Sequence, residues 1–415
     1  MKKIIASIFL ASVIAGAFSG CGSTVSSSSG AENSVYDSQS SSGASHEPIK
    51  LVVWHETTPE IGELLQKEFD KLKPDIEVEV VKKEKMTESL KLAGDSGEPD
   101  MYFFAHDKIG TFAQMEIIAP VTDFISKDDL ADMLPMTVEA ATYQNQVYQA
   151  PIFFETTMFL YNKALMKQIP KTTEELYNYA KENTKDGVYG FLEQHSTAYY
   201  VAAWMHSFGG YIINENAEPG LNLSGTMEAV EYHKKFVEYM PIDGDYQTLS
   251  TLFLEGKAHS IIAGPWLIPN AKEKGIDIGI ASMPTIDETG KPLMSYSGVQ
   301  GISVMKSAES KKEAVAAALK QILKPETGID FAKAMGSAPA NSKCYNDSDV
   351  SGNEIIMNLK QNAENAKPMP NVPEMDVMWT VTENMLTSVN KNNDDIKTEC
   401  EKAQKEAFEK IEAMK

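Results

Sequence analysis

Charged side chains follow two short apolar segments that the sequence predicts to be strands. Glu56 comes after the segment 49–54, and Asp107 and Lys108 come after the segment 101–105. Carboxylate and ammonium groups form charge-assisted hydrogen bonds, which are stronger than hydrogen bonds between neutral groups. Because a parallel sheet binds ligands in the crevice at the carboxyl ends of its strands, these residues predict a binding site for a polar ligand.

The elements that must position these groups alternate between strand and helix. Thr58 is a suitable N-cap for a helix that begins at Pro59, and the apolar residues after it recur with helical spacing until about Pro74. This part of the chain has strand patterns at 49–54, 76–81 and 101–105 and a second helix pattern at 88–92. Such an alternation is typical of an open parallel sheet.

The rest of the chain is richer in helices and aromatic residues. An apolar run ends in Glu155, and a strand that breaks at a Gly-Pro turn presents Trp266. Thr172 opens a segment that resembles a capping box at a helix start. Further predicted elements are strands at 157–161, 260–263 and 301–305 and a helix at 307–323.

One short motif matches a catalytic motif without the sequence context that catalysis needs. Residues 94–97, Gly-Asp-Ser-Gly, match the nucleophile tetrapeptide of trypsin-like serine proteases. The next residue is Glu98 instead of glycine and no histidine-containing companion motif precedes it, so we predict a turn before a strand. The sequence has no nucleophile elbow, zinc-protease, phosphate-loop or calcium-loop motif. Its seven histidines are scattered, so it predicts no metal site and no cofactor.

The net charge of the chain is strongly negative. The 415 residues carry a formal charge of −21 at pH 7, which argues against binding nucleic acid and against attachment to anionic lipids through a basic surface. The charge favours neutral or cationic small ligands instead. The length and the hydrophobic share of 42% are sufficient for two domains with a core each.

Beyond the N-terminal region the chain has only two cysteines, Cys344 and Cys400. They are too few for a disulfide scaffold or a cysteine zinc site, although one disulfide between them is possible. Cys400 lies on an apolar stripe with helical spacing, so we favour a buried structural thiol at this position.

The N-terminal residues predict export and a lipid anchor. Two lysines, an apolar run at 4–18 and small residues before Cys21 describe a signal peptide at 1–20 that is too short for a mature transmembrane helix. The motif resembles the lipobox of bacterial lipoproteins, with Phe18 in the place of leucine, and the resemblance implies acylation of Cys21. The Ser-rich segment 21–47 has the composition of a flexible tether, which predicts a protein held at the extracytoplasmic face of the cell membrane. The alternative is an ordinary secreted protein with a chance cysteine.

Five sequence blocks occur in the order and with the spacing of one protein family. The stretch from Gly97 to Lys108 resembles the Gly-Pro-Asp-x-x-x-x-Ala-His-Asp-Arg stretch of maltodextrin-binding proteins, the extracellular solute-binding components of ABC importers. The likeness runs from about Lys50 to the C-terminus, and it is to solute-binding proteins of family 1. The other blocks are 150–155 with 160–163, 208–211, 263–266, and 369–375 leading to Trp379.

The resemblance implies an α/β protein with the two-lobed periplasmic-binding-protein fold of type II. In that fold, three crossings of the chain form a hinge between the lobes, so each lobe is discontinuous in sequence. The first lobe is expected to take residues 48–153 and 300–336, and the second 158–294 and 341–415. A ligand is expected in the cleft between the lobes, which closes by hinge motion.

The ligand-binding positions of the family carry over to eight residues of this sequence. Flat aromatic rings cover the apolar faces of a sugar, and charged groups hydrogen-bond its rim of hydroxyls. Each residue type also has a purely structural explanation, packing for a tryptophan and helix capping for a carboxylate. The eight residues are Glu56, Phe104, Asp107, Lys108, Glu155, Tyr199, Trp266 and Trp379.

Several positions depart from the family pattern. Lys108 replaces an arginine and therefore loses the planar bidentate contact. Phe104 stands where tryptophan is usual, and Glu383 stands where the family has an arginine. The Asp-Lys pair that follows the first strand in the family falls at residues 58–59, which are Thr-Pro here. These changes leave the number of subsites and the preferred oligosaccharide open.

Three functions are compatible with this pattern. The leading hypothesis is capture of maltodextrin, an α-linked gluco-oligosaccharide, for the permease of an ABC importer by a monomeric binding protein that is not an enzyme. The second keeps the fold but changes the ligand to a β-linked or galactose-containing oligosaccharide. The third is an anchored glycoside hydrolase with Asp107 and Glu155 as paired acid and base, although no hydrolase motif supports it.

Overall fold

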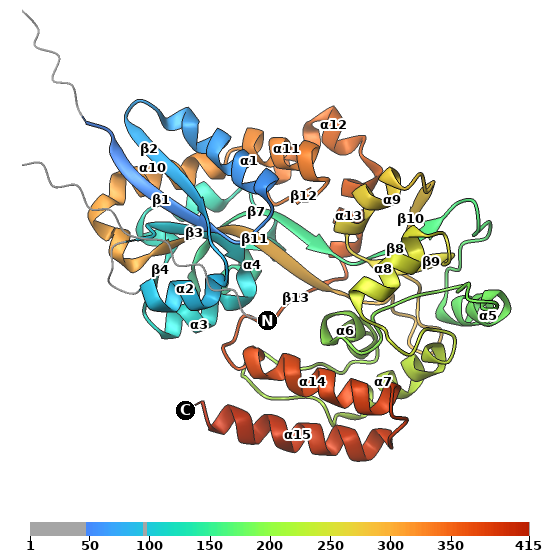
Figure 1. Ribbon diagram of the computed structural model, residues 1–415. Helices are drawn as coiled ribbons and strands as arrows, with labels where there is room; N and C mark the ends of the chain where they lie inside the picture. Colours follow the sequence, from blue (N-terminus) through green and yellow to red (C-terminus); the bar gives the residue numbers. More distant parts are fainter. Residues whose placement is uncertain (1–46, 94–97, 415) are drawn as a thin grey trace, which may run out of the picture. The chain divides into compact units, whose positions relative to one another are not determined.

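A mixed sheet collects strands from distant parts of the sequence (Figure 1). The computed structural model of the protein describes residues 47–93 and 98–414. The strands of the sheet follow the order β12-β7-β11-β3-β1-β2, and β4 and β13 both pair with β11. They are β1 (Ile49–His55), β2 (Ile76–Lys82), β3 (Met101–Ala105), β4 (Ile118–Ala119), β7 (Gln149–Thr156), β11 (Tyr296–Met305), β12 (Ala338–Pro339) and β13 (Lys367–Pro368).

Several features of the sequence lie outside the described residues. These are the predicted signal peptide, the acylated Cys21, the linker up to residue 46 and the tetrapeptide 94–97. The described residues form one compact unit. None of the helices within 47–93 and 98–414 combines the length and the apolar composition that crossing a membrane needs.

The parallel part of the sheet has the predicted arrangement. β1 pairs in parallel with β2 and with β3. α1 (Pro59–Phe69) connects β1 to β2, with Thr58 at the N-cap position and Pro59 in the first turn, and it buries Leu65 and Phe69. The Thr58 side chain itself makes no capping hydrogen bond. α2 (Met86–Ala93) lies between β2 and β3 in the chain, so the alternation of strand and helix is confirmed.

The strand expected at 301–305 is longer than the sequence indicates. β11 begins at Tyr296 and pairs antiparallel with both β3 and β7. Its first half, residues 296–300, contains Gly298 and lacks a clear strand pattern. Partners such as Thr156, which lies opposite Ser297, are more than a hundred residues away and supply the backbone hydrogen bonds. The expected boundary is therefore wrong, because pairing with β7 decides where this strand begins.

A second, smaller sheet is antiparallel and has the order β10-β8-β9. Its strands are β8 (Met158–Asn162), β9 (Ser260–Ala263) and β10 (Ile278–Ala281), and a separate hairpin consists of β5 (Thr142–Tyr143) and β6 (Gln146–Val147). α5 (Thr173–Asn183) begins as predicted, since the Thr172 hydroxyl accepts a hydrogen bond from the backbone N–H of Glu175.

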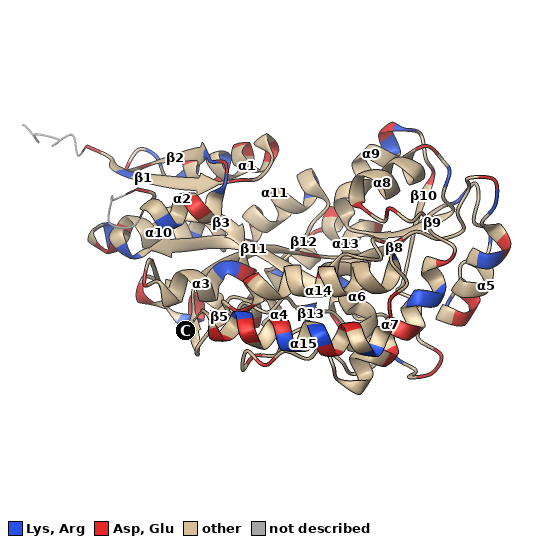
Figure 2. Ribbon diagram, turned by 60° about the horizontal axis from the view of Figure 1, so that its bottom comes forward, with Lys and Arg blue, Asp and Glu red and all other residues tan. Residues whose placement is uncertain are grey.

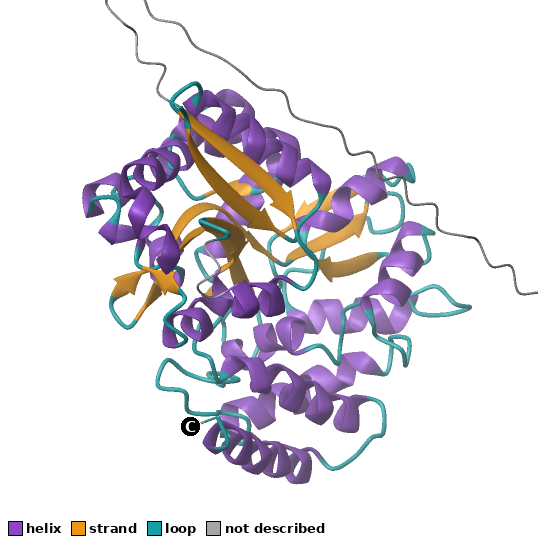
Figure 3. Ribbon diagram, turned by 60° about the vertical axis from the view of Figure 1, so that its left-hand side comes forward, coloured by secondary structure: helices purple, strands orange, loops and turns teal. Residues whose placement is uncertain are grey.

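Helices flank the strands of both sheets (Figure 3). The last two long helices, α14 and α15, pack against each other, and both contact α7. Lysines and acidic residues lie side by side on the exposed side of α15, where they form i,i+4 pairs (Figure 2). The remaining helices are α3 (Ile109–Gln114), α4 (Pro135–Ala140), α6 (Ala198–Ser207), α7 (Ser224–Val237), α8 (Tyr246–Leu254), α9 (Ile268–Glu273), α10 (Lys312–Ile322), α11 (Pro325–Met335), α12 (Ser348–Ser351), α13 (Glu354–Ala363), α14 (Met375–Asn390) and α15 (Ile396–Glu412).

Both cysteines of the described residues are free and buried. Cys400 lies on α15 with Ala403, Ala407 and Ile411, which are also buried, so the predicted apolar stripe faces the core. Met414, at the end of the same stripe, is exposed because the helix ends at Glu412. The thiol has the structural role that the spacing indicates.

Candidate functional site

The polar part of the candidate site begins where β3 ends, in the short helical turn η2 (His106–Lys108). His106 is buried and uses both ring nitrogens. Nδ1 accepts a hydrogen bond from the backbone N–H of Val299 at 3.0 Å, and Nε2 donates to the carbonyl of Met369 at 2.9 Å. Burial lowers the pKa of His106, so the imidazole is neutral. The ring thus ties the turn to β11 and to the segment after β13.

A cluster of one ammonium group and two carboxylates lies at this turn. The Nζ of Lys108 is 2.5 Å from Oδ1 of Asp376 and 3.5 Å from Oδ2 of Asp107. Thr111 donates to the other Asp376 oxygen at 3.4 Å. Burial opposes the charge of Lys108, but Asp107 and Asp376 outweigh it and raise its pKa.

The cluster is only partly enclosed. The side chains of Asp107, Lys108 and Asp376 are 15%, 20% and 30% exposed. A ligand that reaches the cluster can therefore bond carboxylate oxygens that have remaining lone pairs.

The aromatic part of the site gathers around Tyr296, the first residue of β11. The centroid of its ring lies 6.2 Å from that of Tyr199 and 6.0 Å from that of Trp379, which meets it edge to face at 77°. His206 packs against a further side of the ring at 4.7 Å. Tyr199 and Trp379 are partly exposed, whereas Tyr296 is buried. Two partly exposed aromatic residues thus lie next to a buried central tyrosine.

The hydroxyl groups of this aromatic cluster are neutral. Burial raises the pKa of both Tyr199 and Tyr296. The Tyr199 hydroxyl donates a weak hydrogen bond of 3.4 Å to the carbonyl of Tyr296. The Tyr296 hydroxyl is buried and has no hydrogen-bond partner among the residues that the structure describes.

Glu155 lies on β7, opposite Gly298 of β11. Its side chain is partly accessible, and within residues 47–93 and 98–414 no hydrogen bond or ion pair engages its carboxylate. Burial raises the pKa of Glu155 to about 7. Its charge in turn contributes to the raised pKa of Tyr199, so the carboxylate and the phenol are neighbours. A carboxyl group with this pKa can accept or donate a hydrogen bond to a ligand hydroxyl.

Glu56 has a structural partner. Its carboxylate accepts hydrogen bonds from the backbone N–H groups of Lys85 and Met86, at 2.9 and 3.1 Å. These groups lie at the start of α2, where a helix leaves its first N–H groups unpaired and favours negative charge. The structure thus gives Glu56 a capping contact.

Trp266 and Phe104 occupy different surroundings from one another. Trp266 is 39% exposed and lies in the turn η5 (Pro265–Leu267). Its ring covers Gly264 so closely that a Cβ added there would lie 2.0 Å from it, which explains the glycine of the Gly-Pro-Trp sequence. Phe104 is partly buried and packs against the same apolar core as Tyr199 and Trp379.

One helix, α14, connects the polar and the aromatic parts. Asp376, Trp379 and Glu383 follow each other at helical spacing and therefore lie on one face of it. Glu383 accepts a hydrogen bond from the backbone of Ala198, at the start of α6, and burial raises the pKa of Glu383. Because Tyr199 is the next residue, α14 also supports this second ring.

Two residues of the site were not predicted from the sequence, Asp376 and Tyr296. The spacing of Asp376 to Trp379 along a helix is a signal that could have identified the former. Tyr296 gives no such signal, since its neighbours come from α6 and α14.

A groove of about 990 Å³ borders the aromatic cluster, since Tyr296 and His206 contribute to its lining. The rest of the lining comes from Gln114 and from residues between 139 and 144, 209 and 217, 291 and 294, and 367 and 374, and it includes none of the eight predicted side chains. Many of its charged groups, such as Glu139, Lys291 and Lys367, are exposed to solvent. We place the candidate site at the polar and aromatic clusters, which combine accessible rings with polar atoms that have few partners. In the part of the chain that the structure describes, no three His, Cys, Asp or Glu side chains lie together as metal ligands.

Comparison with known families identifies the class of this protein. The family model for bacterial extracellular solute-binding proteins matches residues 65–358. The chain belongs to this family. A crystal structure of a cyclo/maltodextrin-binding protein complexed with maltotetraose superposes with a TM-score of 0.82 at 27% identity, covering 90% of this chain and 100% of that one. This similarity confirms the predicted two-lobed α/β fold.

Characterised relatives differ in their ligands. A maltotriose-binding protein of Pyrococcus abyssi is 30% identical over 378 residues, 88% of this chain and 83% of that protein. A galactooligosaccharide-binding protein of Bacillus subtilis is also 30% identical, over 401 residues, 90% of this chain and 92% of that protein. A maltooligosaccharide ABC transporter solute-binding lipoprotein of Streptococcus pneumoniae is 26% identical over 339 residues, 75% of this chain and 76% of that protein.

Proposed function

We propose that this protein captures a malto-oligosaccharide outside the cytoplasm and delivers it to the permease of an ABC importer. The observation that carries the proposal is that α14 connects two clusters: partly exposed aromatic rings, Tyr199 and Trp379 around Tyr296, and partly paired charged groups at Asp107 and Lys108. Relatives that bind maltotriose and malto-oligosaccharides support it.

The chemistry of the two clusters suits a sugar. A pyranose has apolar C–H faces that stack on flat rings, and aromatic side chains lose little rotamer freedom when they bind. Its hydroxyl groups bond carboxylates and ammonium groups through charge-assisted hydrogen bonds. A rival ligand that lacks one hydroxyl leaves such a group unpaired, which gives selectivity.

We assign the ligand to the cleft between two lobes, residues 48–153 with 300–336 and residues 158–294 with 341–415. The larger sheet falls mainly in the first set of residues and the smaller sheet in the second, which agrees with this division. The proposed ligand contacts are Glu56, Phe104, Asp107, Lys108, Glu155, Tyr199, Trp266 and Trp379.

Isothermal titration calorimetry with maltotriose tests the proposal. We expect a dissociation constant of roughly 1 μM, about −8 kcal/mol, because a delivery protein must also release its sugar. Cellobiose, the β-linked disaccharide, serves as the control and is expected to bind far more weakly. Absence of binding heat at millimolar maltotriose would overturn the ligand assignment.

A galacto-oligosaccharide is the second candidate ligand. The Bacillus subtilis relative that binds such sugars is as similar to this chain as the maltotriose-binding one. A thermal-shift panel of both sugars separates the candidates, since a ligand that binds only the native state raises the melting temperature. A shift with galacto-oligosaccharide alone would assign that ligand instead.

The remaining features of the proposal concern chemistry and location. We propose a monomeric binding protein without hydrolase activity, so maltoheptaose should stay intact by chromatography after prolonged incubation. We also propose that acylated Cys21 anchors the protein at the extracytoplasmic face of the membrane. Replacing Cys21 by serine is expected to release the protein into the medium, as fractionation would detect.

A further inference from the structure

The chain contains no arginine, since all 38 of its basic residues are lysines. Arginine orients itself on a polar ligand through a planar fork of N–H groups, whereas lysine carries a point charge at the end of a flexible stem. A lysine that has to bind a ligand in one fixed direction therefore needs other groups to hold its ammonium. Lys108 is the lysine at the candidate site for which this matters.

Asp376 holds the ammonium of Lys108 from a distant part of the sequence. The two residues are 268 positions apart, and their charged atoms are 2.5 Å from each other. Asp376 is itself fixed by the 3.4 Å hydrogen bond from Thr111 and by its place in the first turn of α14. The Asp107 carboxylate, at 3.5 Å, takes a second side of the ammonium. Two of the three N–H directions of Lys108 thus face carboxylates.

The chain segment before Asp376 is fastened to the same part of the molecule as Lys108. The carbonyl of Met369 accepts the hydrogen bond from His106, and the carbonyl of Asn371 accepts one of 3.0 Å from the N–H of Gly110. The Asn371 side chain also donates to the carbonyls of Ala140 and Thr142. These bonds hold the start of α14 next to the η2 turn, so the ion pair is one of several contacts between the two segments.

We infer that Asp376 is a positioning residue, which holds the Lys108 ammonium so that its third N–H meets a hydroxyl group of the bound sugar. Asp376 thus fixes the direction of the lysine N–H donors, which in arginine the planar guanidinium group fixes by itself. The cluster of two carboxylates and one ammonium keeps a net negative charge, so its oxygens also remain available as acceptors. This inference rests on the proposed function and adds a residue that the family resemblance does not supply.

The test is a double-mutant cycle on maltotriose binding. Asp376→Asn is expected to weaken the affinity about 10-fold, because the ammonium loses a charged partner that fixes its direction. Asp376→Glu should restore part of the loss. In a Lys108→Gln background, Asp376→Asn should cause no further loss, since a residue that acts through Lys108 has nothing left to position. Additive losses in the cycle would overturn the inference.

The matched control is Asp349→Asn, which removes the 2.8 Å ion pair with Lys333. The side chains of this pair are 67% and 42% exposed, and we expect the affinity to stay unchanged. Melting temperatures of all variants show whether each is folded. If the unmodified protein binds maltotriose and Asp376→Asn binds it equally well, the inference fails while the proposed function stands.

A measurement without sugar tests the contact between Asp376 and Lys108 even if the protein binds no malto-oligosaccharide. NMR of the Lys108 side chain, assigned with Lys108→Gln, gives its pKa in the free protein. Asp376→Asn should lower this pKa, because Asp376 is one of the groups that raise it. Absence of malto-oligosaccharide binding would overturn the proposed function, whereas an unchanged Lys108 pKa in Asp376→Asn would overturn the inference by itself.

Discussion

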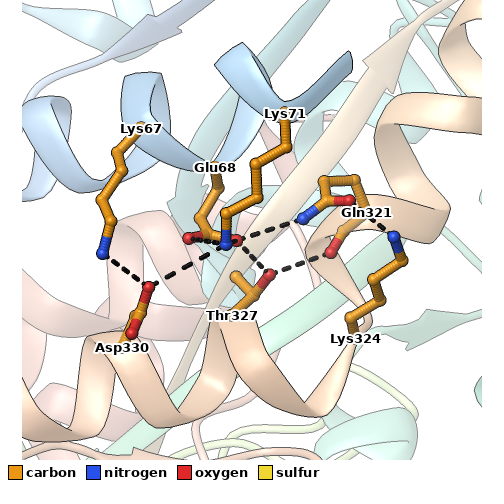
Figure 4. A network of polar contacts seen from close by, with 7 residues as sticks. All are labelled: Lys67, Glu68, Lys71, Gln321, Lys324, Thr327 and Asp330. Carbon is orange, nitrogen blue, oxygen red and sulfur yellow. Dashed lines mark hydrogen bonds and ion pairs between the residues drawn. The ribbon is translucent and has the colours of Figure 1, made fainter.

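Two polar clusters join distant segments of this protein, but they differ in how many of their polar atoms already have a partner within the protein. One links α1 to α10 and α11 around the fully buried carboxylate of Glu68 (Figure 4). Glu68 accepts hydrogen bonds from Thr327 at 2.7 Å and from Gln321 at 3.2 Å, and it pairs with Lys71 at 2.7 Å. The other is the cluster of Asp107, Lys108 and Asp376 at the candidate site.

The contrast lies in what each cluster leaves unbonded. Around Glu68, protein groups occupy the carboxylate and no side is open to solvent. At the candidate site, the three charged side chains keep 15–30% of their surface exposed. A saturated buried network specifies packing, whereas a partly paired and accessible one has bonding capacity left for a ligand. A structural cluster and a binding cluster can therefore carry similar charges. They differ in whether their polar atoms all have protein partners and in how exposed their side chains are.

The largest expected effect tests the structural half of this contrast. Glu68→Ala removes the acceptor of Thr327 and Gln321, which then remain buried without it, so the free energy of unfolding should fall by about 3 kcal/mol. Urea unfolding followed by circular dichroism measures this change. The maltotriose affinity of the folded variant should not change. The control is Glu116→Ala, which breaks an exposed 3.5 Å pair with Lys306 and should cost little stability.

The second prediction tests whether the aromatic cluster at the candidate site binds the ligand. Trp379→Ala should weaken maltotriose binding about 30-fold, roughly 2 kcal/mol, because a partly exposed ring next to Tyr296 is lost as a stacking surface. Calorimetry measures the affinity. Phe408→Ala, at a ring that is 53% exposed on α15, is the control and should bind normally. Equal affinity of Trp379→Ala and the unmodified protein would remove the basis for calling the aromatic cluster a binding surface.

The third prediction concerns Glu155, whose carboxylate has no hydrogen-bond or ion-pair partner among the described residues. Its pKa is raised by burial from 4.5 to about 7, so the native state binds the proton more tightly than the unfolded chain. The stability that comes from this protonation is complete below pH 4.5 and is lost as the pH rises through about 7. Relative to Glu155→Gln, the protein should therefore lose on the order of 1–3 kcal/mol between about pH 4.5 and pH 8.

Thermal and urea unfolding of both proteins across this pH range measure the difference. Glu116→Gln, at a side chain that is 80% exposed, provides a control whose stability should run parallel to that of the unmodified protein. A constant difference between Glu155→Gln and the unmodified protein would contradict the raised pKa.

Local patterns predicted much of the first part of the fold. The strand patterns at 49–54, 76–81 and 101–105 appear as β1, β2 and β3, and the helix begins at Pro59 as expected. Periodicity and turn residues act over a few positions, so they can be recognised in the sequence itself. Asp107 and Lys108 were found for the same reason, since they directly follow a recognisable strand.

The sequence by itself determined which residues could bond a sugar: the carboxylates after the strands, the aromatic residues in the family blocks and Lys108, which replaces an arginine. Only the tertiary structure decided which of them meet. Asp376 reaches Lys108 because residues 369–371 are fastened to η2 and α4, and Tyr296 joins Tyr199 to Trp379 because β11 pairs with β7. Glu56, with the same chemistry as Asp107, also accepts hydrogen bonds from the start of a helix. Contacts between segments hundreds of residues apart depend on packing that no local pattern encodes.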